Sequence, residues 1–147
     1  MDSNHPAPPF IDVCVHRSVH PASVAAELQG GFSSGEIATR QHYLSARQAR
    51  LWRAIAAAFS PARDTDDGMR AYDAVNEAIG GRLDEAGVHV IGLGCADGAK
   101  ERTLLESLPP GGPVVATPVD VSLPLLQIAA DQLSGAGSAA LRRHARC

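Results

Sequence analysis

The chain has 147 residues, of which 45% are hydrophobic, 20% charged and only 4% aromatic, and its formal net charge is −3 at pH 7. This length suits one domain with a hydrophobic core, and the composition is that of an alanine-rich globular protein rather than a disordered one. The slightly acidic balance gives no broad positive field, so we expect neither nucleic acid nor a membrane as a partner.

The cysteines and histidines suggest neither a disulfide framework nor a metal site. Cys14, Cys95 and Cys147 are odd in number and far apart, and the six histidines show no pairing at ligand spacing. The N-terminus lacks a basic stretch followed by an apolar core, and no segment approaches the roughly 18 apolar residues that span a bilayer. We therefore expect a cytoplasmic protein.

In chain order, residues 1–20 should form an extended or disordered lead-in that includes an apolar, strand-like segment at Phe10–Val15. Residues 21–87 should form an N-terminal helical part. Its first helix opens near Pro21 and closes at Gly30, because proline suits the first helical turn and glycine the end of a helix.

The clearest helix of the first half spans residues 46–59, with Ser45 before it as a capping residue. Leu51, Trp52, Ile55 and Phe59 fall on one face of this helix, which predicts that they enter the core. After a polar loop at residues 64–68, a second apolar pattern predicts a helix over residues 69–79, ended by paired glycines.

From residue 88 the pattern changes to alternating strands and helices, which indicates a parallel sheet with crossover helices. The expected βαβα unit, residues 88–133, has this order: strand 88–93, helix 97–108, strand 114–119 and helix 122–133. Residues 134–147 are rich in Ser, Gly, Ala and Arg, and we expect a flexible tail there.

A glycine-containing turn follows the first of these strands. Gly92, Gly94 and Gly98 allow the backbone to approach a ligand closely, and the next helix points its first N–H groups at the same space. Asp120 ends the neighbouring strand, where a carboxylate can accept hydrogen bonds from both hydroxyls of a ribose. A strand, a glycine turn, a helix and an acid at the next strand end together predict a nucleoside site.

The segment Gly92-Leu-Gly-Cys-Ala-Asp-Gly-Ala-Lys-Glu-Arg-Thr-Leu-Leu-Glu-Ser-Leu108, followed by Pro118-Val-Asp-Val-Ser122, resembles the S-adenosylmethionine site of the histidine-specific methyltransferase family, which includes the ergothioneine-pathway enzyme. The segment 40–52 is similar, less specifically, to that family's N-terminal helical part. The resemblance spans residues 32–133, and its specific part is 90–122. It implies an α/β fold with a doubly wound, Rossmann-like sheet that is only partial here, since the chain stops before the family's later strands.

The resemblance also implies S-adenosylmethionine as cofactor and a small-molecule substrate, an amino acid or related amine. The implied cofactor-binding residues are Gly92, Gly94, Cys95, Ala96, Lys100, Asp120 and Val121. The family has an acidic residue where this chain has Gly92, and a glycine where it has Ala96. Because the family's later strands and substrate-binding half are missing, we expect little or no methyl transfer by this chain alone.

Two other interpretations stay open. The chain could be a non-catalytic module that binds a nucleoside weakly or pairs with a protein partner through an open sheet edge. It could also bind a nicotinamide dinucleotide, although the following helix lacks the close-packing glycine at the expected spacing.

Overall fold

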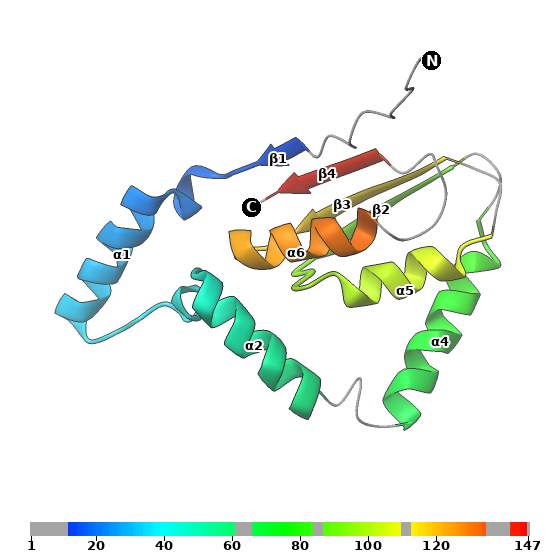
Figure 1. The fold of residues 1–147 in the computed structure, drawn as a ribbon, viewed down its shortest axis with the longest axis horizontal. Helices are drawn as coiled ribbons and strands as arrows, with labels where there is room; N and C mark the ends of the chain where they lie inside the picture. Colours follow the sequence, from blue (N-terminus) through cyan, green and yellow to red (C-terminus); the bar gives the residue numbers. More distant parts are fainter. Residues whose placement is uncertain (1–11, 61–65, 84–86, 110–112, 135–141, 147) are drawn as a thin grey trace, which may run out of the picture.

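The structure is a computed structural model that describes residues 12–60, 66–83, 87–109, 113–134 and 142–146. It is an α/β arrangement in which helices gather along one side of a parallel sheet (Figure 1). The predictions for residues 1–9, for most of the turn at 109–112 and for residues 135–141 lie outside the described residues.

The sheet has four parallel strands in the order β1-β4-β3-β2. Its strands are β1 (Asp12–Cys14), β2 (Val88–Leu93), β3 (Val114–Val119) and β4 (Arg142–Arg146). The bounds of β2 and β3 are those predicted from the sequence, and the two strands pair along their whole length, from Val88 with Val114 to Leu93 with Val119.

Two crossover helices connect the last three strands: α5 (Ala99–Ser107) and α6 (Leu123–Ser134). Since β2, β3 and β4 follow one another across the sheet in a single direction, two crossovers of the same hand bring both helices to the same face. Figure 1 shows α5 and α6 side by side there, and they pack against each other. The predicted βαβα unit is therefore present, with each helix beginning one or two residues later than expected.

The core lies under α6, which buries Leu125, Leu126, Ala129, Ala130 and Leu133 along one face. Their spacing of one, four, five and eight residues is that of an amphipathic helix lying on a sheet. Burying large aliphatic side chains in this way contributes roughly 1.5–3 kcal/mol each. Because α6 also contacts β3, β4 and α2, it positions the ends of the strands relative to the N-terminal helices.

The N-terminal part is helical, as predicted. Its helices are α1 (Pro21–Ser34), α2 (Ala46–Phe59) and α4 (Asp66–Gly80), with 3-10 turns η1 (Arg17–Val19) and η2 (Thr39–His42). The structure confirms Ser45 as the N-cap of α2, in a reciprocal capping box with Gln48. The helix α1 continues past Gly30 to Ser34, and α4 includes Asp66–Gly68, which the sequence had assigned to a loop.

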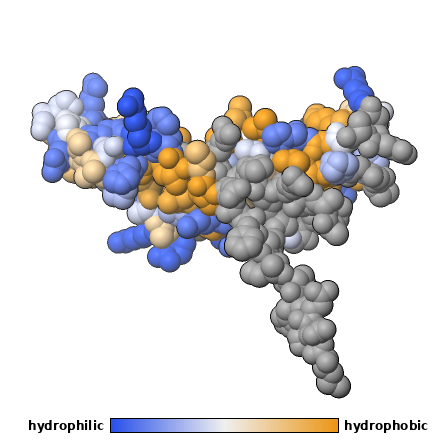
Figure 2. Space-filling view, turned by 90° about the horizontal axis from the view of Figure 1, so that it is seen from above, coloured by the Kyte–Doolittle hydropathy of each residue, from blue (hydrophilic) through white to orange (hydrophobic). Residues whose placement is uncertain are grey.

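The prediction that α2 buries its apolar face is wrong for most of that face. Leu51, Ile55 and Phe59 are 55%, 59% and 75% exposed, and only Trp52 of that group is partly buried. The physical reason is that α2 meets α6 and the turn after β2 through a narrow contact: Ala49 is its buried residue, and Trp52 lines a cavity with Cys95 of the turn. Figure 2 shows that hydrophobic side chains also gather in patches on the surface seen from above the sheet.

The prediction of a flexible tail over residues 134–147 is wrong for Arg142–Arg146. This segment forms β4, which lies between β1 and β3 and pairs in parallel with both. The sequence did not predict this strand, because the segment is rich in arginine and lacks the β-branched and aromatic residues that are enriched in strands. The strand-like segment predicted at Phe10–Val15 contains β1, which pairs with the other side of β4. Among the described residues, no helix combines the length and hydrophobicity needed to cross a membrane.

Candidate functional site

The turn after β2 has the backbone conformation that its glycines predict. Gly94 and Gly98 have φ angles of +62° and +79°, in the left-handed region that glycine enters without a steric cost. Ala96, between them, also has a positive φ of +51°. A side chain at residue 94 would meet no atom within 4 Å, so the backbone there borders open space.

Asp120, at the carboxyl end of β3, lies directly against this turn. Its Oδ2 accepts a hydrogen bond of 2.9 Å from the backbone N–H of Ala96, and its Oδ1 accepts one of 2.8 Å from the N–H of Ser122. The N–H of Cys95 donates to the carbonyl of Val119 at 3.1 Å. The two strand ends therefore converge, as the sequence analysis required.

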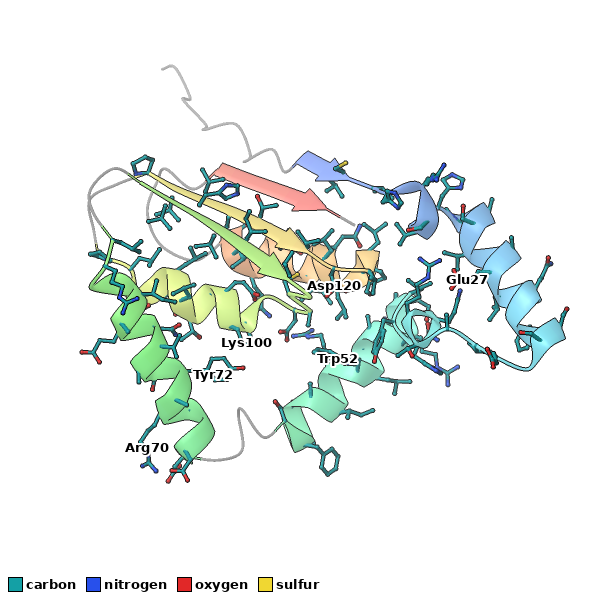
Figure 3. All side chains as sticks on the ribbon, turned by 180° about the vertical axis from the view of Figure 1, so that it is seen from behind. Glu27, Trp52, Arg70, Tyr72, Lys100 and Asp120 are labelled. Carbon is teal, nitrogen blue, oxygen red and sulfur yellow. The ribbon has the colours of Figure 1, made fainter. Side chains whose placement is uncertain are left out.

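The carboxylate of Asp120 has a structural role in addition to any ligand. Its two hydrogen bonds to backbone N–H groups fix the turn to the end of β3. Figure 3 labels Asp120 at this end of the sheet. A carboxylate has about four lone-pair sites, so each oxygen can still accept a further hydrogen bond. Ribose hydroxyls could therefore donate to Asp120 without displacing the backbone.

Cys95 is not an activated thiol. It is 1% exposed and belongs to the core cluster with Leu126 and Ala129. Burial, followed by the negative charges of Asp120 and Glu101, raises the pKa of the Cys95 thiol to about 12. The thiol is therefore protonated at neutral pH, and its position in the turn serves packing.

Glu101 occupies the space that a side chain on residue 92 would fill. A Cβ added to Gly92 would lie 2.6 Å from Glu101 Oε1 and 2.7 Å from its Cγ. The Glu101 Oε2 atom is buried and has no hydrogen-bond partner among the described residues. Burial therefore raises the pKa of this carboxyl group. The glycine at residue 92 is what allows an acidic side chain from α5 to lie against β2.

The start of α5 is less open to an anion than the sequence suggested. Asp97 Oδ1 accepts a hydrogen bond of 3.3 Å from the N–H of Ala99, and Asp97 Oδ2 lies 3.4 Å from Arg53 Nε of α2. The charges of Asp97 and Asp120 both add to the raised pKa of Glu101, so negative charge gathers around the turn. A phosphate would be repelled there, whereas a cationic group would be favoured.

A cavity of about 450 Å³ lies beside the turn, between α2, α4 and α5. Figure 3 shows Trp52, Tyr72 and Lys100 converging on this space from the three helices. Its walls are formed by Trp52, Ala56, Ser60, Met69, Tyr72, Asp73, Asn76, Cys95, Asp97, Ala99, Lys100 and Thr103. This volume is within the range of small-molecule sites.

The predicted cofactor residues divide between two sides of the turn. Cys95 and Lys100 line the cavity. Ala96 contacts Asp120, and Val121 is exposed next to it. Gly92 is buried against Glu101, and Gly94 borders solvent. The turn and Asp120 are thus brought together, whereas the cavity lies on the side of α2 and α4.

Sequence reasoning missed the cavity residues of α4 and the buried carboxyl of Glu101. The signal that was available is the spacing of three, four and seven residues that places Met69, Tyr72, Asp73 and Asn76 on one face of a helix. Two polar side chains on a face that also carries large apolar ones indicate a lined cavity. The packing of α4 against α5, which closes the cavity, could not be inferred from either helix alone.

No family model and no curated protein matches the sequence. Within the described ranges, no three or more His, Cys, Asp or Glu side chains are grouped so that they could hold a metal ion.

Proposed function

We propose that this chain binds S-adenosylmethionine at the turn after β2, as a methyltransferase-like domain of Rossmann-like type. The observation that carries the proposal is the contact between Asp120 and the glycine turn, with its hydrogen bond of 2.9 Å to Ala96. This contact brings a carboxylate at the end of β3 to the turn at the end of β2. The turn is bordered by open space at Gly94.

The charges around the turn support a cationic cofactor over a dinucleotide. S-adenosylmethionine carries a sulfonium and an ammonium group, while NAD carries two phosphates. Asp97 and Asp120 lie beside the turn, and Asp97 already accepts from the Ala99 N–H at the start of α5. These carboxylates favour the first cofactor and oppose the second.

When bound, this cofactor supplies an electrophilic methyl group. The chain's own residues would hold and orient it: Asp120 would accept from the ribose, and the backbone at Gly94 would lie against the methionine portion. The methyl acceptor would be a small amine, such as an amino acid, in keeping with the likeness of the segment 90–122 to the histidine-specific methyltransferases. Histidine is the first acceptor to test, with mass spectrometry of the product.

Isothermal titration calorimetry of the purified chain with S-adenosylmethionine and with NAD tests the proposal. We expect saturable heat with the first only, and binding roughly tenfold weaker in Asp120→Asn, since a hydrogen bond to a charged group contributes about 1.5–3 kcal/mol. Asp131→Asn, an exposed acid of α6, is the matched control and should bind as wild type. Equal binding of both cofactors, or of neither, would overturn the assignment.

A second candidate function is protein binding through β2. In the sheet that the described residues form, β2 is an edge strand, and its Ile91 and Leu93 side chains are 56% and 79% exposed. An edge with unpaired backbone groups and exposed apolar side chains is suited to pairing with another strand. Light scattering of the wild type and of Leu93→Lys tests this: association that the lysine abolishes supports it, and a monomer in both cases contradicts it.

A further inference from the structure

The cavity between α2, α4 and α5 is built mostly from residues that the proposed cofactor site does not use. We propose that it binds a flat nitrogen heterocycle whose edge carries neighbouring N–H donors and an acceptor, as guanine does. The residues of α2 and α4 that line it take no part in the cofactor assignment, and only Cys95, Asp97 and Lys100 are used in both.

An amide that lacks a protein partner lines the cavity. Asn76 is 8% exposed, and its side chain makes no hydrogen bond to any of the residues that the structure describes. Its amide atoms are not among the fully buried atoms without a partner, so a ligand in the cavity can reach them. Because an amide both donates and accepts, its natural partner is a group that also does both.

A carboxylate lies next to this amide. Asp73 also lines the cavity, three residues before Asn76 on α4, and its side chain makes no ion pair or hydrogen bond within the described part of the chain. Residues three apart on a helix are surface neighbours, with about 5–6 Å between their Cβ atoms. At this spacing the Asp73 carboxylate presents acceptors to the cavity beside the donor of the Asn76 amide. The complementary edge has two adjacent N–H groups beside an acceptor.

Two aromatic side chains form part of the cavity walls. Trp52 comes from α2 and Tyr72 from α4, and Figure 3 shows both directed into the space under α5. Aromatic rings on opposite sides of a cavity favour a flat, polarisable ligand that can lie against them. The cavity opens to solvent between these helices, because Met69 and Tyr72 on its rim are 51% and 42% exposed.

Lys100 supplies the remaining polar contact. It lies on α5, across the cavity from the acidic face of α4, and is exposed. The Asp97 carboxylate is held by Arg53 and by the Ala99 N–H, so it closes the cavity wall. A heterocycle whose N–H edge faces Asp73 and Asn76 would direct its other side toward Lys100, which can donate to a ring nitrogen or carbonyl.

Trp52 is the only tryptophan in the chain, so its fluorescence reports on this cavity directly. We expect guanosine to change the Trp52 emission saturably, and inosine, which lacks the 2-amino donor, to bind roughly tenfold more weakly. Adenosine should be weaker than guanosine as well, since it lacks the paired N–H donors. Calorimetry repeats each titration, so that a bound ligand without optical effect is still detected.

Two variants test the polar face without removing the walls. Asp73→Asn and Asn76→Leu should each weaken guanosine binding roughly tenfold, whereas Glu77→Gln, an exposed acid on the same helix, should leave it unchanged. Circular dichroism checks that all three fold as the wild type does. Binding of adenosine as tight as that of guanosine, unchanged binding in both cavity variants, or no binding of guanosine would each overturn the proposal.

The same titrations separate this proposal from the cofactor assignment. Asp120→Asn should weaken S-adenosylmethionine binding and leave guanosine binding intact, while Asp73→Asn should do the reverse. Loss of both ligands in both variants would mean one shared site, and it would contradict the claim that the cavity is distinct.

Discussion

Glu101 carries a carboxyl group that the fold buries without satisfying. Its Oε2 has no hydrogen-bond partner among the described residues, and burial raises its pKa. A buried acid with a raised pKa keeps its proton when folded at a pH where the unfolded chain has lost it. The unfolded state then binds fewer protons, so the free energy of unfolding falls as the pH rises.

Glu101→Gln should therefore stabilise the protein above the ordinary pKa of a glutamate and have little effect below it. Above that pKa we expect a gain of about 1 kcal/mol, because a neutral amide removes the cost of burying an ionisable acid, and one pKa unit corresponds to about 1.4 kcal/mol. Urea denaturation at pH 4 and at pH 8 measures this difference, with Glu77→Gln, an exposed glutamate of α4, as control. An equal effect at both pH values would contradict the role assigned to burial.

The residues of the turn also show what a sequence can predict locally. Gly94 and Gly98 were expected to adopt unusual backbone angles, and both have positive φ. Asp120 was expected to meet the turn, and it does so through the N–H of Ala96. The position of Glu101 over Gly92 was not expected, because it depends on how α5 lies on β2, and no single-residue pattern records that.

At the scale of elements, the β2–α5 turn is held by its contact with α6. A Cβ added to Gly98 would lie 3.0 Å from both Cα and Cβ of Ala129, which is fully buried. The φ of +79° at Gly98 is a second reason for glycine. Two independent constraints, one on backbone angle and one on space, therefore act at a single residue.

Gly98→Ala should lower the free energy of unfolding by about 2–4 kcal/mol, the sum of left-handed strain and overpacking against α6. Gly35→Ala is the matched control, because Gly35 has a φ of +77° but no atom within 4 Å of an added Cβ. It should cost only about 1–2 kcal/mol, from strain alone. Urea denaturation of both variants measures the difference. Equal losses would show that contact with Ala129 is unimportant.

The helices and strands divide into those that local patterns define and those that packing defines. The bounds of α2, β2 and β3 agree with the sequence analysis, because capping residues and apolar runs mark their ends. Which face of α2 is buried did not agree. Ala49 is buried and Phe59 is 75% exposed, since burial depends on where the neighbouring elements lie. Hydrophobicity alone ranks these two residues in the opposite order.

At the scale of the whole molecule, the strand order shows which half of the sheet could be predicted from the sequence and which could not. Parallel strands β2 and β3 with a helix between them follow from alternation of patterns, so this half of the sheet was predictable. The pairing of β1 with β4 joins residues 12–14 to residues 144–146, more than 125 positions apart. Such long-range pairing leaves no local signal, which is why Arg142–Arg146 was expected to be flexible.

The position of β4 between two strands leads to a prediction about the whole sheet. The backbone of β4 pairs with β3 on one side and β1 on the other, so this strand holds the N-terminal segment to the βαβ unit. Ala145→Pro would remove one ladder N–H and place a ring in a central strand, and the carbonyl left without its donor costs about 1–3 kcal/mol. Ala145→Val keeps the N–H and favours an extended strand, so it should be neutral or slightly stabilising. Urea denaturation followed by circular dichroism compares the two variants. If residues 142–146 were instead a flexible tail, both variants would unfold as the wild type does, because neither change would disturb a paired backbone.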